Sequence, residues 1–345
     1  GTGDDMGRAV AVDNTGNVYI IGHFPGTAYF GTTTLTSSGS SDVFIAKLDG
    51  SGNWVWARKA GGADPDNGHR IALDSSNNIY ITGLFSSTAS FGSYSISSSG
   101  GYDIYIAKLN NAGTWQWAKK AGGTGSDYGY GLQPDADGNV YLSGFFNDTA
   151  SFGSTTLTSY GDKDIFISKL TASGTWLWTK KAGGIGSDSS SMVALDNEGF
   201  VYVSGNFSST GNFGGISLSS TGSSDALVAK LDTEGNWIWA SRAGGTGSDD
   251  VSQMTVNYDN DIYVTGTFRE VAGFGGTNLT SSGDDDVFVA RLDIGGNWLN
   301  AIRAGGSGTE DGNCIGVDAS GNVYTSGFFS GTAVFGSTSL VSAGD

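Results

Sequence analysis

Residues 13–24 read D-N-T-G-N-V-Y-I-I-G-H-F, and this stretch returns five more times, each time 61 residues after the last. Its closing Gly-x-Phe returns with it each time, from Gly22/Phe24 to Gly327/Phe329. Its tyrosine recurs as Tyr19, Tyr80, Tyr141, Tyr202, Tyr263 and Tyr324. A fixed period of this length is typical of repeat architectures. The first question is therefore what a single unit of 61 residues folds into.

Each of the first five units contains four short segments that are rich in β-branched and aromatic residues and are bounded by turn residues. In the first unit these segments are 8–12, 17–24, 43–48 and 54–60. This pattern predicts strands, and no segment of comparable length shows a helical period. The sequence therefore predicts an all-β protein.

The connections between these segments carry residues that favour a left-handed backbone. The connection from the first to the second strand always places Gly or Asn at one position: Gly16, Asn77, Gly138, Gly199, Asn260 and Gly321. The connection from the third to the fourth strand places glycine at the matching position: Gly52, Gly113, Gly174, Gly235 and Gly296. Because Gly and Asn adopt positive φ most readily, both connections are predicted to be short hairpins. Each unit then becomes one up-and-down sheet of four strands.

A single small sheet cannot bury both of its faces, so it must stack on its neighbours. Radial stacking of four-stranded sheets gives a β-propeller, which also protects the sheet edges. We expect one propeller domain over residues 1–345 with six blades, the last incomplete. The predicted repeats are 1–61, 62–122, 123–183, 184–244, 245–305 and 306–345. The sixth stops before its third and fourth strands, and we expect the protein to continue beyond it.

The motif D-x-x-G-N-V-Y-x-x-G, followed by D-V-F-I-A-K-L-D-x-x-G-N-W-V-W, resembles the bacterial SBBP-type β-propeller repeat. The resemblance covers essentially the whole chain. It implies a secreted or cell-surface protein in which the propeller is one module of a longer, multidomain chain. It implies no general catalytic residues.

Charge and composition limit the partners of the chain. The formal net charge is −17 and the pI is near 4.2, so attraction to nucleic acid or to an anionic membrane is not expected. No apolar run reaches membrane-spanning length, so membrane insertion is not predicted either. The single cysteine, Cys314, lies in an apolar stretch and is predicted to be a buried, inert thiol.

Two positions near the start of each first strand vary in an otherwise repetitive sequence. Position 8 and its copies read Arg8, His69, Tyr130, Ser191, Ser252 and Asn313. Position 6 and its copies read Met6, Asn67, Tyr128, Ser189, Asp250 and Asp311. First strands approach the central channel of a propeller, so we predict a ligand pocket at the channel mouth. Its candidate residues are Arg8, His69, Tyr128, Tyr130 and Asn313; the alternative is that such positions are wet and vary without constraint.

The repeated residues are assigned structural roles. Trp54, Trp56 and their copies are predicted to pack between sheets, although an aromatic belt that binds sugars is the alternative. Acidic residues such as Asp42 and basic residues such as Lys47 and Lys59 return in every complete unit. They are predicted to form one structural set of hydrogen bonds and ion pairs per unit, without a choice of partners.

An enzyme is not predicted. The chain has two histidines, His23 and His69, and neither has a Ser or Cys motif for nucleophilic catalysis beside it. No cofactor is expected. Residues 135–138 and 284–286 cluster acidic side chains as calcium sites do, but neither continues into a full calcium loop.

The leading hypothesis is a non-catalytic surface module that mediates adhesion or contact with a surface protein. The second is a lectin that binds a glycan through aromatic residues such as Tyr128, Tyr130, Tyr29 and Tyr94. The third is a structural spacer in a larger surface protein.

Overall fold

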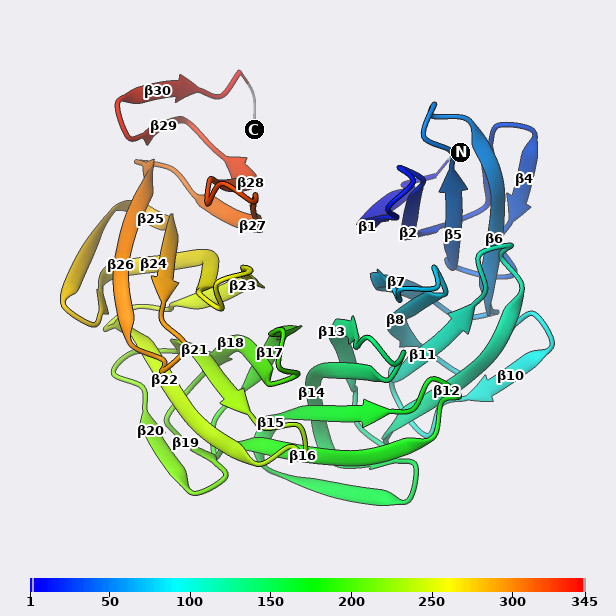
Figure 1. Cartoon of the computed structure of the whole chain (residues 1–345), viewed down its shortest axis with the longest axis horizontal. Helices are drawn as coiled ribbons and strands as arrows, with labels where there is room; N and C mark the ends of the chain where they lie inside the picture. The colour runs from blue at the N-terminus through cyan, green and yellow to red at the C-terminus, as the bar shows by residue number, and fades with distance from the viewer. Residues whose placement is uncertain (2, 344–345) are drawn as a thin grey trace. The chain divides into compact units, whose positions relative to one another are not determined.

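The computed structural model describes residues 1 and 3–343, which form strands and turns without any helix (Figure 1). Accordingly, no helix within this described part of the chain is suited to crossing a membrane. Neighbouring strands pair antiparallel. The all-β prediction is confirmed. The chain divides into two compact units, residues 1–159 with 166–180 and residues 160–165 with 181–345.

Four-stranded antiparallel sets account for most of the first unit. Their strand orders are β1-β2-β5-β6, β7-β8-β11-β12 and β13-β14-β15-β16. Residues 160–165, in the middle of β15, and residues 181–184, at the end of β16, belong to the second unit. The bounds are β1 Met6–Val12, β2 Val18–Phe24, β5 Asp42–Leu48, β6 Trp54–Gly62, β7 Asp66–Leu73, β8 Ile79–Phe85, β11 Asp103–Leu109, β12 Trp115–Gly123, β13 Tyr128–Pro134, β14 Val140–Phe152, β15 Thr155–Leu170 and β16 Trp176–Gly184.

The second unit repeats this arrangement. It contains the sets β17-β18-β21-β22 and β23-β24-β25-β26, followed by the two-stranded sheet β27-β28. The bounds are β17 Ser189–Leu195, β18 Val201–Phe207, β21 Asp225–Leu231, β22 Trp237–Gly245, β23 Asp250–Val256, β24 Ile262–Phe274, β25 Thr277–Leu292, β26 Trp298–Gly306, β27 Glu310–Val317 and β28 Val323–Phe329.

The turn chemistry follows the prediction. Gly16 has φ 82° and Asn77 has φ 58°, and the amide of Gly16 donates to the carbonyl of Asp13 at 3.0 Å. Gly52 takes the same role in the second kind of turn, with φ 82°. The four strands predicted for the first repeat begin and end within two residues of β1, β2, β5 and β6. The number of blades remains a prediction.

The connection from the second to the third strand, for which the sequence predicts no strands, is a further β-hairpin. In the first set it is β3 (Thr27–Phe30) and β4 (Thr33–Thr36), joined at Gly31 with φ 61°. Ala28 and Phe30 are buried while the residue between them is exposed, which is the alternation of a strand. The copies are β9 Thr88–Phe91, β10 Tyr94–Ser97, β19 Thr210–Phe213, β20 Ile216–Ser219, β29 Thr332–Phe335 and β30 Thr338–Val341, and in β14-β15 and β24-β25 they merge into long strands.

The fourth strand is longer than predicted because a Gly-Gly pair extends it to the hairpin of the following set. Gly61 and Gly62, at the end of β6, pair with Ser90 and Ala89 of β9. A Cβ on Gly62 would lie 1.9 Å from the carbonyl oxygen of Thr88, so a larger residue does not fit. The same extension joins β12 to β14, β16 to β19, β22 to β24 and β26 to β29.

Within each unit the face of one set packs on the next set. In the first unit Tyr19 and Ile21 of β2 share a core with Ile79 and Ile81 of β8. A side chain buried this fully contributes about 1.5–3 kcal/mol. Trp56 is 8% exposed, and its Nε1 donates to the carbonyl of Asn111 at 3.2 Å. The second tryptophan of this strand therefore packs as predicted.

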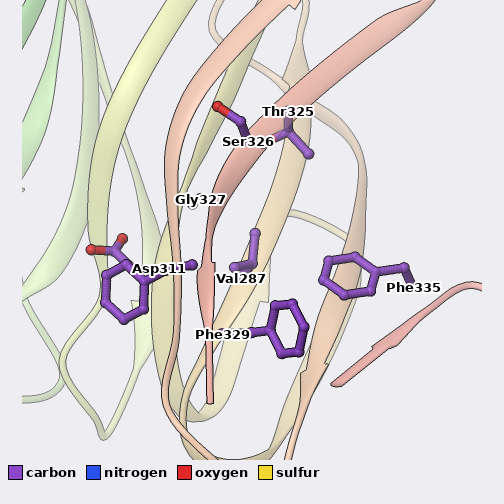
Figure 2. A pocket seen from close by; sticks show the side chains of 9 residues that line it. Val287, Asp311, Thr325, Ser326, Gly327, Phe329 and Phe335 are labelled. Atoms are coloured by element: carbon purple, nitrogen blue, oxygen red, sulfur yellow. The ribbon is translucent and has the colours of Figure 1, made fainter. Parts of the chain in front are cut away.

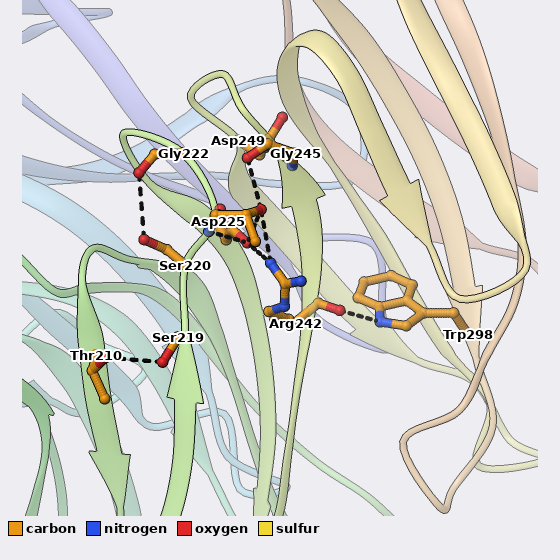
Figure 3. Close-up of polar contacts among 10 residues, drawn as sticks. Thr210, Ser219, Ser220, Gly222, Asp225, Arg242, Gly245, Asp249 and Trp298 are labelled. Atoms are coloured by element: carbon orange, nitrogen blue, oxygen red, sulfur yellow. Dashed lines mark hydrogen bonds and ion pairs between the residues drawn. The ribbon is translucent and has the colours of Figure 1, made fainter.

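A polar arrangement repeats beside each Gly-Gly pair, and Figure 3 shows the copy in the second unit. Arg242 forms an ion pair with buried Asp225, and buried Asp249 accepts a hydrogen bond from the amide of Gly245 at 2.8 Å. The predicted ion-pair set is thus present. Equivalent pairs are Lys59–Asp42, Lys120–Asp103, Lys181–Asp164 and Arg303–Asp286.

One prediction is wrong: the thiol of Cys314 is exposed. Cys314 lies in β27, whose sheet has two strands. So small a sheet covers too little surface to bury an apolar stretch on both of its faces.

Candidate ligand-binding site

The residues at position 8 share one backbone feature, a β-bulge in the first strand. In β7, Gly68 pairs with Gly83 and Arg70 with Thr82, so His69 is the extra residue between them. The bulges of the other first strands hold Arg8, Tyr130, Ser191, Ser252 and Asn313. A bulge removes a side chain from the alternation of its strand and re-aims it. The variable residue of each repeat is thus held at a fixed and distinct place.

In the first unit this device brings five aromatic residues together, which we call the aromatic cluster: His69, Tyr102, Tyr128, Tyr130 and Phe145. The ring of His69 stacks on that of Tyr130 at 4.9 Å between centroids and 15° between planes. Tyr128 stacks on Phe145 at 4.8 Å and 22°. Tyr102 meets Tyr128 edge-on at 6.2 Å. Each of the five is half-buried, so part of each side chain stays accessible.

His69 has a defined tautomer. Its Nδ1 lies 3.1 Å from the carbonyl oxygen of Gly129, and a carbonyl only accepts, so Nδ1 carries the proton. Burial, aided by the positive charge of Arg8, lowers the pKa of His69 to about 4. The ring is therefore neutral at neutral pH. Its Nε2 is then an acceptor.

The tyrosines supply donors. Burial raises the pKa of Tyr130 to about 12 and also raises the pKa of Tyr128 above its ordinary value. Both phenols therefore stay protonated over the physiological range. Arg8 is exposed, and its charge acts on His69 and Tyr130. Together these groups offer aromatic faces, hydroxyl donors, one imidazole acceptor and one cation.

The same positions in the second unit are small or acidic. Ser191 donates through its hydroxyl to the carbonyl of Val251, the contact that His69 makes to Gly129. Half-buried Asp250 has a pKa raised to about 7, first by burial and then by the charge of Asp311. Exposed Asn313 also belongs to this unit. Of the predicted site residues, the structure brings His69, Tyr128 and Tyr130 into contact, with Arg8 acting through its charge.

Two members of the cluster were missed. Tyr102 precedes the repeated Asp103 at a position where the other complete repeats have Ser, Lys or Asp, and Phe145 stands directly opposite Tyr128 across the β13-β14 ladder. Both are large residues at variable positions, which is the signal that could have found them. Tyr29 and Tyr94, considered above for sugars, lie on hairpin strands β3 and β10 and are 66% and 37% exposed.

The acidic runs considered for calcium are engaged in other contacts. Asp135 accepts hydrogen bonds from the amides of Asp137 and Asn139 at 3.0 and 2.8 Å. Asp285 forms an ion pair with Arg269 at 2.9 Å. Among residues 1 and 3–343, no group of three or more His, Cys, Asp or Glu side chains is arranged to hold a metal ion.

Comparisons with known proteins support the repeat assignment. Residues 55–84 match the family model of the SBBP β-propeller repeat, which confirms the resemblance drawn from the sequence. This match runs from β6 through the Gly-Gly pair into β8. Its frame therefore spans the junction between two sets.

Two curated proteins are similar at lower identity. An uncharacterised WD repeat-containing protein of Acanthamoeba polyphaga mimivirus is 23% identical over 94% of this chain, and the regulatory protein FlaEY of Caulobacter vibrioides is 26% identical over 45% of it. The aligned parts make up 30% and 17% of those proteins. The chain thus corresponds to a minor part of each relative.

Two solved structures are also similar. BamB from Moraxella catarrhalis has a TM-score of 0.36 at 14% identity, with 93% of this chain and 96% of BamB covered. A protein of unknown function from Bacteroides caccae has a TM-score of 0.36 at 9% identity, with 82% and 93% covered.

Proposed function

We propose that this chain is a non-catalytic module of six β-propeller blades that binds a partner protein through the aromatic cluster. The observation that supports the proposal is the cluster itself: five half-buried aromatic side chains at variable positions of a repeated scaffold. Aromatic residues in partly desolvated patches supply much of the energy of protein interfaces. The bulges fix these side chains before binding, which reduces the entropy lost on association.

The test uses two matched double variants. Tyr128→Ala with Tyr130→Ala removes the rings at positions 6 and 8 of the third repeat; Ser189→Ala with Ser191→Ala changes the same positions of the fourth. Surface proteins of the producing cell are captured on each folded variant and quantified by mass spectrometry. We expect the tyrosine variant to lose a specific partner at least tenfold and the serine variant to keep it. Equal retention by both would contradict the proposal.

A glycan is the second candidate ligand, favoured by the combination of stacked rings, protonated phenols and the Nε2 acceptor of His69. Sugars present apolar faces to aromatic rings and hydroxyls to such donors and acceptors. A glycan array, run with calcium and again with EDTA, tests this candidate. Selective binding that the tyrosine variant loses would identify a lectin, and loss in EDTA alone would reveal a functional metal. An array without binding, both with calcium and with EDTA, would exclude a glycan as the ligand.

The proposed location is the cell surface or the exterior, as one module of a longer chain. The family resemblance supports this location, and fractionation of the producing cells with an antibody to the chain tests it. Absence of catalysis and of a cofactor is part of the same proposal. Turnover that disappears on replacing His69 would contradict it. If neither a protein nor a glycan binds, the results favour the hypothesis of a structural spacer.

A further inference from the structure

Lys47 and Asn111 bring an amine into contact with a carboxamide. Both residues belong to the first unit: Lys47 lies in β5, and Asn111 lies in the turn between β11 and β12. Nζ of Lys47 is 2.5 Å from Oδ1 of Asn111. The carbon that bears this oxygen, Cγ, is one C=O bond away from it and therefore lies within about 3.7 Å of Nζ. Atoms that are positioned to react are about 3–3.5 Å apart, so a small rotation of the carboxamide is enough.

This pairing of side chains occurs once among the complete repeats. Each of them has lysine or arginine at the position of Lys47, but the turn residue 64 places further on varies. Only asparagine carries a carboxamide there. The copies of Asn111 are Gly50, Ala172, Thr233 and Ile294. Lys108 therefore meets the backbone carbonyl of Ala172, at 3.3 Å, in place of a side chain.

The hollow of the second unit that Figure 2 shows offers no comparable chemistry. Val287, Phe329 and Phe335 line it with apolar side chains, and Asp311 adds a carboxylate. None of its lining residues is a lysine. An amide bond needs an amine, so the contact of Lys47 with Asn111 is the one to consider.

Lys47 also differs from its copies in its electrostatic partner. Lys108 forms an ion pair with Asp74 at 3.9 Å, and Lys230 forms one with Asp196 at 3.4 Å. In the part of the chain that the structure describes, Lys47 forms no ion pair with a carboxylate, and the carboxamide of Asn111 takes that place. A carboxylate stabilises the charged form of an amine, which is not nucleophilic. The neutral carboxamide has no charge with which to do so.

Tyr19 supplies a hydrogen-bond donor to the carboxamide oxygen. Its hydroxyl lies 2.7 Å from Oδ1 of Asn111 and 3.1 Å from Oδ2 of Asp13. Burial, followed by the hydrogen bond and the charge of Asp13, raises the pKa of Tyr19, so the hydroxyl keeps its proton. Tyr19 is fully buried and Lys47 is 8% exposed. In such surroundings a fixed donor stabilises a developing negative charge more strongly than water does.

The two reacting groups are held in place. Nζ of Lys47 lies over the ring of Tyr19, 5.0 Å from its centroid. The backbone of Asn111 is fixed by Trp56, whose Nε1 donates to its carbonyl at 3.2 Å. Groups that are held in contact behave as if they were present at about 10⁵–10⁸ M. This proximity compensates for a small fraction of neutral amine.

We propose that Lys47 and Asn111 form an amide bond between their side chains, an isopeptide bond, in the folded chain. Water takes one proton from the lysine ammonium, and the neutral Nζ attacks Cγ of Asn111. Tyr19 donates to Oδ1 as this oxygen becomes negative. Nδ2 then takes a proton from Nζ, the bond between Cγ and Nδ2 breaks, and ammonia leaves from the exposed side of Asn111.

The products balance without an oxidant or a reductant. One ammonium side chain and one carboxamide become one amide and, after the ammonia regains a proton from water, one ammonium ion. The chain loses one positive charge and the mass of one ammonia molecule. The bond ties β5 to the turn after β11 and so reduces the entropy of the unfolded chain. It does not involve the aromatic cluster, so its test is independent of ligand binding.

The test measures the intact mass of the purified full chain, before and after incubation in a mildly alkaline buffer that increases the neutral form of lysine. We expect a mass lower than that of the sequence by one ammonia. Trypsin should no longer cleave after Lys47, and the digest should contain the Lys47 and Asn111 peptides joined. An unchanged mass after incubation would overturn the proposal. Loss of ammonia without the joined peptides would also overturn it, because an asparagine that closes to a succinimide releases ammonia too.

Two matched variants and one condition serve as controls. Asn111→Ala introduces the residue that the next repeat carries as Ala172, and Lys47→Arg introduces the one that the fifth carries as Arg291, so neither disturbs the fold. Circular dichroism checks that both variants fold. Each is expected to show at least tenfold less loss of ammonia than the parent chain, as is the parent chain kept unfolded in urea. Equal loss in any of the three would overturn the proposal.

Discussion

The first strands of the two units use one backbone device for two kinds of chemistry. β7 and β13 place His69 and Tyr130 in their bulges, and the two rings stack. β17 and β23 place Ser191 and Ser252 in the same bulges, where Ser191 bonds to the backbone of the next first strand. The repeat therefore places one bulge in each first strand. The chemistry at each bulge depends on the few residues that do not repeat.

Steric room at position 7 gives the largest expected effect on stability. A Cβ on Gly129 would lie 2.7 Å from Oγ1 of Thr82 and 2.8 Å from Cγ2 of Ile104, whereas Val251 fills the equivalent place fully buried. Gly129→Val should cost about 1–3 kcal/mol by overpacking. Thermal unfolding of the full chain measures the cost, and near-ultraviolet circular dichroism reports on the aromatic cluster. A stable Gly129→Val chain with an unchanged spectrum would show that the space beside Gly129 can accommodate valine as the space at Val251 does.

The hydrogen bond of the bulge residue gives an intermediate effect. Ser191→Ala should cost about 0.5–1.5 kcal/mol, because the hydroxyl bond to Val251 is lost. His69→Ala loses the equivalent bond to Gly129 and the stacking on Tyr130, which adds about 0.5–1.5 kcal/mol. Urea unfolding of both variants measures the difference. Equal costs would mean that the stacking of His69 on Tyr130 adds nothing to the free energy of unfolding.

pH should move the two units in opposite directions, by about 1 kcal/mol or less because both groups are partly exposed. Asp250 has a pKa raised to about 7 from an ordinary 3.8, so its contribution is full at low pH and is lost as the pH rises through about 7. His69 has a pKa lowered to about 4 from 6.5, so its contribution is full above 6.5 and is lost as the pH falls toward 4. Asp250→Asn should remove the loss of stability that develops as the pH rises from 3.8 to about 7, and His69→Gln the loss that develops as the pH falls from 6.5 to about 4. Profiles that are unchanged by both variants would contradict these assignments.

The sequence predicts the features of the fold that depend on neighbouring residues. Gly16 and Asn77 indicate their turns in the sequence because a positive φ is a requirement of the single residue. The four strands predicted for the first repeat also lie where expected. The hairpin β3-β4 was missed because its Ser- and Thr-rich strands lack a strong apolar pattern. The Gly-Gly extension was missed because its partner lies almost 30 residues away in the chain.

The site could be predicted in part. His69, Tyr128 and Tyr130 were found because they break a repeat, which is visible in one sequence. The bulge that re-aims His69 and Tyr130 could not be found, because it is defined by counting residues against the opposite strand. Tyr102 and Phe145 were missed for the same reason: their contacts with Tyr128 depend on pairings between strands.

The Gly-Gly pair also bears on how such a chain can grow or shrink in evolution. Each complete repeat contributes a strand end, such as Gly61 and Gly62, and each repeat after the first accepts one on its hairpin, as β9 does. Duplication or loss of a whole 61-residue segment therefore leaves a Gly-Gly strand end beside a hairpin at every new junction, wherever the recombination point lies. An insertion of any other length leaves one strand end or one hairpin without its partner. Recombination by whole periods is the change that this backbone tolerates without new side chains.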